Sequence, residues 1–324
     1  MPRPKVLLIG ATGNAGGSIL EALLAAERFD VEILIRPSSA SKPAVQALTQ
    51  KRGIPQRIVD IDLPSDELVP ALANVDILIC SLGPGPVSVT QQKGLVRAAK
   101  KAGVRRFVPS SWITIAPPHG AMLLTEETEE IYHEILLHSL GYTIIDVGYW
   151  YQTSFPPLPS GRTDYAIPLK ETRTIHGDGT APNILTEIGD IGRFVARIIA
   201  DERTLNRRVY TCGEVLTENE IFAVVEEMAG ERVERVFEPP EETQRKATLA
   251  LEELAKDPHD IRKLIPVWLE QYRYSKYVRQ DNRPEYAEYL GYLDARQLYP
   301  DLRPTSFREY FAEVLAGRAR NPYA

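Results

Sequence analysis

The chain has 324 residues, and its 38 lysines and arginines against 44 aspartates and glutamates give a formal net charge of −6. Its 44% hydrophobic and 25% charged residues are typical of a globular protein, which excludes a disordered or fibrous chain. The acidic balance argues against nucleic acid as a partner, because phosphates select basic surfaces.

The number of cysteines and the N-terminal segment indicate the cellular compartment in which the protein is expected. Cys80 and Cys212 are too few for a disulfide framework and lack the C-x-x-C spacing of redox or zinc sites. The first residues pass directly into a strand-like run at 6–9, which leaves no room for a signal peptide. No apolar run has the length of a membrane span. We therefore expect a cytoplasmic protein that does not contact a membrane.

The first half of the chain alternates strand-like and helix-like segments. The expected strands are 5–9, 31–35, 56–60, 75–80, 106–108 and 143–147, and the expected helices are 15–26, 42–52, 66–73, 89–102 and 125–140. This alternation is typical of a parallel sheet with helices on both faces. It predicts an α/β fold with a doubly wound parallel sheet, contained in a domain over 1–150.

The rhythm ends after Val147, where a proline-rich and aromatic segment covers 149–168. Beyond it we expect helices at 190–200 and 218–229 and strands at 208–211 and 232–237. These short, mixed elements predict a smaller α+β lobe over 151–324 that depends on the first domain for folding. The tyrosine-rich stretch 272–299 fits packing within this lobe or a contact in a homodimer.

The main basic cluster consists of Lys100, Lys101, Arg105 and Arg106. It lies where the helix expected at 89–102 gives way to a strand. We interpret these residues as solvated cations at a helix C-terminus, where they complement the helix dipole.

A glycine-rich segment, Gly10-Ala-Thr-Gly-Asn-Ala-Gly-Gly17, joins the first strand to the first helix. Gly10 permits a sharp turn, Gly13 allows the backbone to approach a pyrophosphate, and Gly16 allows the helix and strand to pack closely. The N–H groups of the following helix then face the anion. The spacing is G-x-x-G-x-x-G, not the G-x-G-x-x-G fingerprint, but its position predicts a dinucleotide site.

The residue that follows the second strand distinguishes the two nicotinamide dinucleotides, since a carboxylate there binds the ribose 2′-hydroxyl of NAD. Here that residue is Arg36, with Ser38, Ser39 and Lys42 nearby. A guanidinium and hydroxyls suit a 2′-phosphate, so we expect NADP(H). The alternative is that Arg36 is a solvated cation.

Other strand ends should meet the same ligand, because the carboxyl ends of parallel strands share one edge of the sheet. Asp60 ends the third expected strand, beside the adenine. The segments after the fourth and fifth strands are Ser81-Leu-Gly83 and Pro109-Ser-Ser-Trp112. Asp60 and Asp62 lack a third ligand nearby in sequence, so no metal is expected there.

These segments resemble the NmrA-like atypical short-chain dehydrogenases, and among them the isoflavone reductase-like proteins. The resemblance runs through most of the chain, including the glycine loop, the 34–39 and 98–111 segments, and later landmarks near 176–179, 190–192, 203–206 and 297–301. It implies a Rossmann-type domain, NADPH, and a small aromatic secondary metabolite as substrate. It also implies that Gly10, Thr12, Gly13, Asn14, Ala15, Gly16 and Arg36 contact the dinucleotide, and that Ser81, Leu82, Gly83, Pro109 and Ser110 flank its ribose and nicotinamide.

One departure from the resembled family concerns catalysis. Reductases of that family carry a lysine on the helix before the sixth strand, which polarises or protonates the substrate. Counted back from Gly141, that position is Thr128, and 102–169 contains no lysine. The Tyr-x-x-x-Lys pair of the wider short-chain group is missing too, because Leu136 follows Tyr132 at the fourth position. A threonine hydroxyl can donate a hydrogen bond but carries no charge.

Replacements for the lysine lie on the same helix. Tyr132 shares a face with Thr128, and His133 can titrate near neutral pH, so we take all three as candidate catalytic residues. Packing or surface roles are the alternative for the tyrosine and the histidine. His133 and His138 are five residues apart, not four as in a zinc protease motif, so we expect no metal.

Aromatic residues follow the fifth and sixth strands. Trp112, Tyr149 and Trp150 are expected to line a flat apolar substrate pocket, or else to pack the lobes together. The sequence therefore favours an NADPH-dependent reductase of a carbonyl, imine or conjugated double bond in a small aromatic metabolite. Two alternatives follow from the missing lysine: a non-redox dehydratase, isomerase or cyclase, and a dinucleotide-binding regulatory sensor like NmrA.

Overall fold

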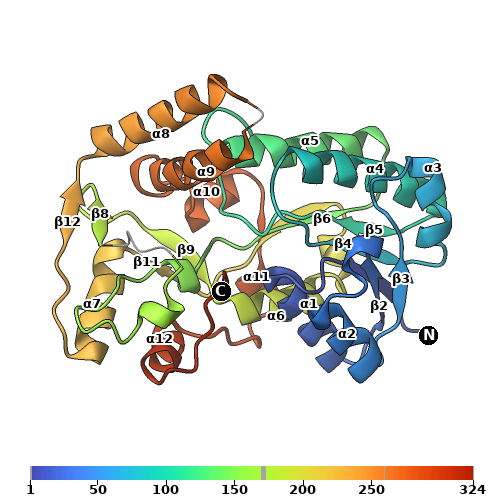
Figure 1. Ribbon diagram of the computed structural model, residues 1–324, viewed down its shortest axis with the longest axis horizontal. Coiled ribbons are helices and arrows are strands. Elements are labelled where there is room, and N and C mark those ends of the chain that lie inside the picture. The colour runs from blue at the N-terminus through green and yellow to red at the C-terminus, as the bar shows by residue number, and fades with distance from the viewer. Residues whose placement is uncertain (1, 169–172, 259, 324) are drawn as a thin grey trace. The chain divides into compact units, whose positions relative to one another are not determined.

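The computed structural model describes residues 2–168, 173–258 and 260–323 and is shown in Figure 1. The chain forms two compact units. The first comprises Met1–Trp112, Glu127–Asp146 and Ile191–Val209, and the second comprises Ile113–Glu126, Val147–Asp190 and Tyr210–Ala324. The expected single boundary near residue 150 therefore does not describe the division, because the chain passes between the units several times.

A parallel five-stranded sheet forms the centre of the first unit. Its order is β3-β2-β1-β4-β5, from β1 (Lys5–Ile9), β2 (Asp30–Ile35), β3 (Gln56–Ile58), β4 (Ile77–Cys80) and β5 (Arg106–Val108). β6 (Thr143–Asp146) lies beyond β5, since the Phe107 N–H donates to the Gly141 carbonyl at 2.8 Å. The strand order reverses between β1 and β4, which places ligands at the carboxyl ends of these strands. This confirms the predicted doubly wound α/β fold.

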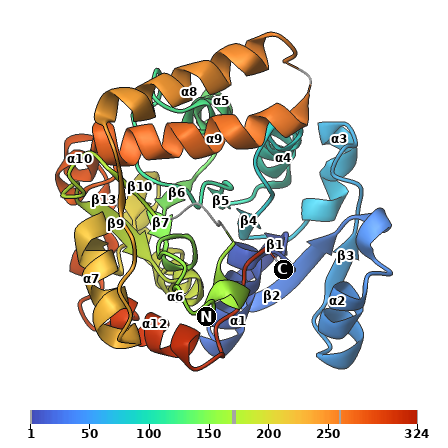
Figure 2. The ribbon, with the colours of Figure 1, turned by 60° about the vertical axis from the view of Figure 1, so that its left-hand side comes forward.

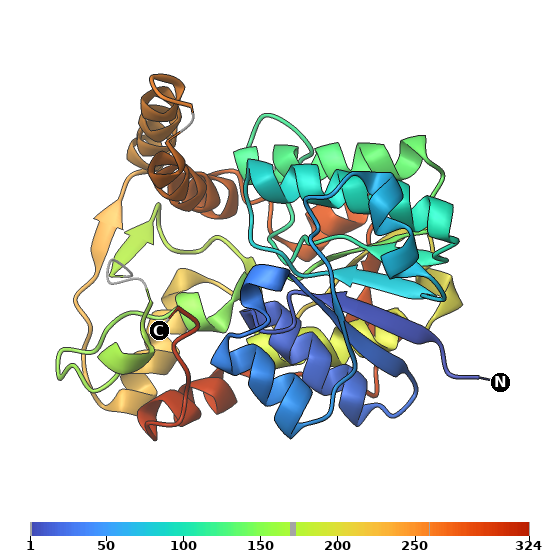
Figure 3. The same ribbon diagram turned by 45° about the vertical axis from the view of Figure 1, so that its right-hand side comes forward.

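Six helices belong wholly or largely to this unit: α1 (Asn14–Ala25), α2 (Pro43–Gln46), α3 (Ser65–Leu68), α4 (Pro86–Ala102), α5 (Leu123–Leu137) and α6 (Ile188–Ile198). Figure 3 shows α4 and α5 on one face of the sheet and α1 on the other. Leu7 and Leu78 pack with Leu95 and Ile135 on the α4 and α5 side. Because both faces are covered, the central strands β1 and β4 are apolar almost throughout, which explains why they stood out in the sequence.

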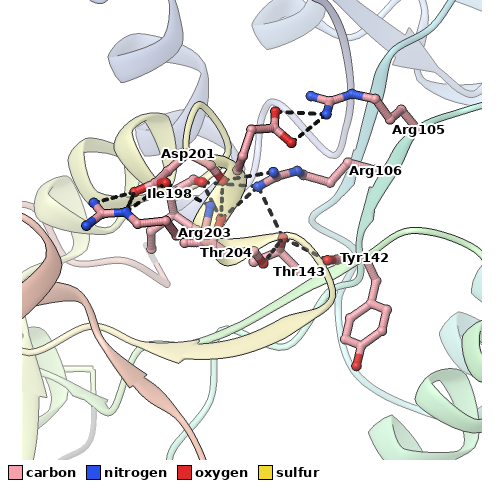
Figure 4. A network of polar contacts seen from close by, with 9 residues as sticks. Arg105, Arg106, Tyr142, Thr143, Ile198, Asp201, Arg203 and Thr204 are labelled. Carbon is pink, nitrogen blue, oxygen red and sulfur yellow. Dashed lines mark hydrogen bonds and ion pairs between the residues drawn. The ribbon is translucent and has the colours of Figure 1, made fainter.

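Arg106 departs from the expected solvated cluster. Lys100 and Lys101 do lie in the last turn of α4, but Arg106 is fully buried. Figure 4 shows its guanidinium donating to the Thr143 and Thr204 hydroxyls and to the carbonyls of Ile198 and Asp201. Carbonyls at the end of α6 carry partial negative charge, so they stabilise the buried cation. The interpretation of Arg106 as a solvated residue was wrong.

The second unit contains small sheets and several helices. β9 (Asn183–Thr186) pairs with β7 (Tyr149–Trp150) and β11 (Glu214–Leu216), and β8 (Thr174–His176) pairs with β12 (Val236–Glu238). The strand expected at 232–237 is limited to β12, because Val233 turns inward beside α7 (Glu218–Ala229), where its N–H donates to Glu226. β13 (Leu293–Asp294) also lies in this unit, whereas β10 (Arg207–Tyr210) belongs to the first unit except for its last residue.

The remaining helices follow in chain order: α8 (Pro240–Ala255), α9 (Leu264–Arg273), α10 (Pro284–Tyr289), α11 (Ala295–Leu298) and α12 (Phe307–Leu315). Figure 2 shows α8 and α9 lying side by side, and a π-helical turn over Tyr274–Val278 extends α9. The aromatic residues of α12 pack with Tyr151, Phe155 and Phe222 in a core of this unit. Within the described ranges, no helix has the length and apolarity needed to cross a membrane.

Candidate functional site

The glycine turn after β1 packs more tightly than any side chain would permit. Gly10 has a φ of +84°, and a Cβ added there would lie 2.0 Å from the Ser81 carbonyl oxygen. A Cβ on Gly16 would lie 2.0 Å from the Gly10 carbonyl oxygen. Both contacts are with backbone atoms, which cannot move aside as a flexible side chain can. The turn therefore requires glycine at both positions so that α1 can begin directly beside β4.

The N-terminus of α1 is open to an anion. Gly13 is its N-cap and offers no side-chain cap, and the first turn contains no acidic residue. A Cβ on Gly13 would meet only the Gly10 carbonyl oxygen, at 3.4 Å, so its outer side is not filled by the described protein. First-turn N–H groups and the positive end of the helix dipole stabilise a phosphate at this position. The turn thus fits a dinucleotide pyrophosphate.

Arg36 directly follows β2 and is exposed. No described residue forms a hydrogen bond or ion pair with its guanidinium. Its carbonyl accepts from the Ser39 N–H at 2.9 Å, which closes the 3₁₀ turn Pro37–Ser39. Ser38 and Lys42 are exposed as well. An unpaired guanidinium beside hydroxyls fits a 2′-phosphate group.

Asp60 lies two residues beyond the end of β3 and is exposed. Its carboxylate accepts from the Asp62 N–H at 3.1 Å, and the Asp62 carboxylate accepts from Gln91 at 2.8 Å. Across the described ranges, no group of three or more histidine, cysteine, aspartate or glutamate side chains is arranged to hold a metal ion. The Asp60 contact is thus local to the turn after β3, and the role of Asp60 beside the adenine stays a prediction.

The loops after β4 and β5 lie against each other. The Ser110 hydroxyl donates to the Leu82 carbonyl at 2.8 Å, and the Ser110 N–H donates to Gln92 on α4 at the same distance. The structure therefore brings together the 81–83 and 109–110 segments singled out in the sequence. Gly83 is exposed between them, whereas Pro109 is buried.

Tyr132 is the centre of a polar cluster at the carboxyl ends of β5 and β6. Its hydroxyl donates to the Ser111 hydroxyl at 3.0 Å, and that hydroxyl in turn donates to the carboxylate of Asp146. All three side chains are buried. Burial and the charge of Asp146 raise the pKa of Tyr132, while Ser111 and Arg208 oppose this rise. The phenol is accordingly a neutral hydrogen-bond donor at rest.

Arg208 covers the ring of Tyr132. Its guanidinium carbon lies 4.9 Å from the ring centroid, and its Nη2 donates to both carboxylate oxygens of Glu129, at 2.9 and 3.0 Å. Arg208 comes from β10, far from Tyr132 in sequence, and no motif had indicated it. Asp146 was also missed. Its position at the end of β6 was the only signal that could have identified it.

The other candidates on α5 lie in different surroundings. Thr128 is buried one turn before Tyr132, whereas His133 is exposed and lies outside the cluster. His138 contacts Glu134 at 2.9 Å, and Arg97 binds the same carboxylate at 2.6 Å. These contacts account for the histidines and glutamate that superficially resembled a zinc motif.

Glu127, next to Thr128, carries an isolated carboxyl group. It accepts a hydrogen bond from the Gly85 N–H at the start of α4. Its Oε2 is buried and has no hydrogen-bond partner among the described residues. Burial raises the pKa of Glu127 to about 7. No sequence pattern indicated this buried group, because a run of glutamates in a first helical turn normally faces solvent.

Trp112 is buried in a left-handed conformation with a φ of +46°. Large side chains rarely adopt this conformation, and it directly follows Ser111 of the cluster. The indole Nε1 is buried without a hydrogen-bond partner among the described residues. Strained residues of this kind concentrate at ligand sites, where the surrounding structure holds them in place.

In the second unit, Tyr149 lies beneath a buried lysine. The ammonium of Lys276 is 3.1 Å from the Tyr149 ring centroid and 3.3 Å from the Tyr277 hydroxyl. Tyr277 stacks on His176, whose Nδ1 contacts Glu218 at 2.9 Å. Burial lowers the pKa of Lys276 well below its usual value. Trp150 is half-buried beside Tyr149 on β7.

Comparison with known proteins identifies the family. The model of the NmrA-like family matches residues 2–311. The chain is 39% identical to asnovolin J 5′,6′-dehydrogenase of Aspergillus novofumigatus, over 96% of the chain and 95% of that protein. It is 27% identical to the phenylcoumaran benzylic ether reductase Betv6 of Betula pendula, over 97% and 99%.

Among solved structures, the complex of leucoanthocyanidin reductase from Vitis vinifera with NADPH has the same fold. It superposes with a TM-score of 0.79 at 22% identity, covering 96% of this chain and 99% of that one. The relatives named by sequence are a dehydrogenase and a reductase, which supports an oxidoreductase. The family match over nearly the full length shows that this chain belongs to the NmrA-like family.

Proposed function

We propose that this protein is an NADP(H)-dependent oxidoreductase of the isoflavone reductase type. Its substrate would be a small aromatic secondary metabolite with a carbonyl, an imine or a conjugated double bond. One observation carries the proposal: the glycine turn that fits a pyrophosphate follows β1, and Ser111 of the Tyr132–Ser111–Asp146 cluster follows β5 at the same edge of the same parallel sheet. Ligands of doubly wound sheets bind at this edge.

The cofactor would be held by residues of the first unit alone. Gly10, Gly13 and Gly16 allow the approach of the pyrophosphate, and Arg36 with Ser38 would bind the 2′-phosphate. Ser81–Gly83 and Pro109–Ser110 would flank the nicotinamide end. When bound, the dinucleotide supplies or accepts the hydride.

The protein would supply the proton. Tyr132 would donate it to the atom that gains an electron pair during reduction, and would accept it during oxidation. Its hydroxyl is buried and hydrogen-bonded, so bulk water does not compete for the proton. Trp112, next to Ser111, would contribute aromatic surface for the substrate, and Tyr149 and Trp150 of the second unit stay sequence-based candidates for the same role. Thr128 remains a candidate hydrogen-bond donor beside Tyr132.

Cofactor choice is tested by titrating the purified protein with NADPH and NADH. In Arg36→Asp, NADPH binding should weaken roughly 10–100-fold more than NADH binding, because a charge-assisted phosphate contact is lost and a repulsion is gained. Lys42→Ala, which removes a second cation near the turn, serves as the comparison. Equal titration curves for the two cofactors would refute the assignment of Arg36.

Turnover is tested with NADPH and a panel of aromatic ketones, enones and imines, following cofactor absorbance and product mass. Cofactor oxidation with a gain of two hydrogens supports the proposal. A changed product without cofactor oxidation indicates a dehydratase, isomerase or cyclase, and binding without any conversion indicates a sensor. If Thr128→Lys reduces a panel compound that the unmodified protein leaves intact, the natural protein is not a reductase of that class.

A further inference from the structure

Tyr132 has charged neighbours on three sides. Asp146 on β6 reaches it through Ser111, Arg208 on β10 covers its ring, and Glu129 on its own helix holds Arg208. Two of these neighbours are anions, which oppose loss of the phenol proton. Arg208 is the cation that the structure places against the ring, and its charge favours the phenolate, as does the hydrogen bond of Ser111.

Arg208 is fixed in this position. One of its guanidinium nitrogens contacts both oxygens of Glu129, at 2.9 and 3.0 Å, and both side chains are largely shielded from solvent. A guanidinium stays protonated under all ordinary conditions. Its charge is therefore permanent, and its distance to the ring does not depend on a flexible surface side chain.

We propose that Arg208 is a positioning residue that stabilises the negative charge formed on Tyr132 when this tyrosine gives its proton to the substrate. The inference rests on the proposed function. Thr128 and Leu136 occupy the positions at which related reductases would carry a lysine. Arg208 would supply the positive charge that such a lysine would otherwise provide. It comes from a remote strand, so no local motif could reveal it.

In the reduction of a carbonyl substrate, each bond that forms is matched by a bond that breaks. Hydride from the nicotinamide cofactor forms a C–H bond at the carbonyl carbon, and the π-electron pair moves to the oxygen. The O–H bond of Tyr132 breaks, its proton goes to that oxygen, and a phenolate remains against the guanidinium. Solvent protons then restore the phenol through Ser111 and Asp146. In oxidation the same transfers run in reverse.

The experiment compares Arg208→Gln and Arg208→Lys with Arg207→Gln, which removes the exposed arginine next to it on β10. The reaction is NADPH oxidation with the panel compound that is reduced fastest. We expect Arg208→Gln to lower kcat roughly 10-fold with little change in NADPH affinity, because the phenolate loses its cation. Arg208→Lys should keep most of kcat, and Arg207→Gln should keep all of it.

A double-mutant cycle and chemical rescue separate charge from packing. Guanidinium chloride should restore part of the kcat of Arg208→Ala, whereas sodium chloride at equal ionic strength should not. In a Tyr132→Phe background the Arg208 substitutions should have no further effect. An undiminished kcat in Arg208→Gln, or an equal loss in both backgrounds, would overturn the role of Arg208.

Failure of the proposed function has a different signature. If no panel compound is reduced, or if Tyr132→Phe keeps full kcat, the function or the role of Tyr132 is wrong. The contact itself is then tested by NMR of protein labelled at tyrosine Cζ. The Tyr132 signal, assigned with Tyr132→Phe, should shift in Arg208→Gln and not in Arg207→Gln. An unshifted signal contradicts the inference.

Discussion

Tyr132 and Tyr149 each carry a buried or half-buried cation on one face of the ring, and the two cations differ. Arg208 lies 4.9 Å from the Tyr132 centroid and is paired with Glu129. Lys276 lies 3.1 Å from the Tyr149 centroid, and its one hydrogen bond to a described residue is to the Tyr277 hydroxyl. The first arrangement belongs to the first unit and the second to the second unit.

The difference shows how the type of side chain and its burial together decide the charge of a buried cation. The Arg208 guanidinium keeps its charge and its carboxylate, so it can act on a neighbour through its field. Lys276 is desolvated without a direct carboxylate contact, and this burial lowers the pKa of its amine well below the usual value. The same ring contact thus accompanies a permanent charge in one unit and a removable charge in the other.

The largest expected effect is a loss of kcat when the hydroxyl of Tyr132 is removed, which would assign catalysis to the ring beside Arg208. Tyr132→Phe keeps the ring beneath Arg208 but removes the proton donor, so kcat should fall about 10²–10⁴-fold. The control is Tyr289→Phe, which alters an exposed tyrosine of α10. Steady-state NADPH oxidation with the best panel compound measures both. A Tyr132→Phe protein as active as the control would remove the functional distinction between the two sites.

Lys276→Met should stabilise the protein near neutral pH by about 1–4 kcal/mol, because an apolar side chain of similar volume replaces a desolvated amine. The unfolded chain binds a proton at Lys276 up to its ordinary pKa of 10.5, whereas the folded chain releases it at lower pH. The wild-type free energy of unfolding should therefore gain a contribution as pH rises toward 10.5.

Urea unfolding at several pH values tests this second prediction. Lys276→Met should lack the alkaline gain, and Lys42→Met, which removes an exposed lysine, should keep it. Parallel pH profiles for Lys276→Met and the wild type would show that Lys276 titrates as an ordinary lysine.

Glu129→Gln should lower the free energy of unfolding by about 1–3 kcal/mol, because Arg208 would lose a charged partner while staying protonated. Glu130→Gln is the matched control, since it breaks the more exposed ion pair with Lys93, for which less than about 1 kcal/mol is expected. Urea unfolding at pH 7 compares the two. Equal losses would mean that Arg208 does not depend on its carboxylate.

The smallest effect concerns Glu127, whose buried Oε2 has no hydrogen-bond partner among the described residues. Its folded pKa of about 7 exceeds the ordinary value of 4.5, so the folded chain binds the extra proton between these pH values. The wild-type free energy of unfolding should fall as pH rises from 4.5 to 7. Above pH 7 the free energy of unfolding of Glu127→Gln should therefore have increased relative to the wild type by roughly 1 kcal/mol. Glu67→Gln, on exposed α3, should show no such gain in the same unfolding series.

Local patterns predicted much of the fold. The strand and helix rhythm placed β1 to β6 within a few residues, and it was clearest at the central strands β1 and β4, which are covered on both faces and apolar almost throughout. The glycine turn was also recognisable, since backbone contacts at Gly10 and Gly16 admit no side chain. The helix expected at 42–52 was less regular, with a π-helical turn at Ala47–Lys51.

The candidate site was predictable only in part. Tyr132 was named because helical spacing places it beside Thr128, but its contacts with Ser111 and Arg208 join three separate segments. Arg106 was misread for the same reason, because the carbonyls that bury it come from the end of α6 and the turn after it. His133 was named on its chemistry alone, and the structure places it on the exposed side of α5.

By itself, the sequence determined the α/β class, the glycine turn and the cationic residue after β2, since these depend on steric and periodic rules acting over a few residues. Tertiary structure decided which charges are paired. Arg208 contacts Glu129 and Lys276 contacts the Tyr149 ring because strands and helices distant in sequence pack together. Burial then fixes the energy of each charge, and burial is a property of the folded chain.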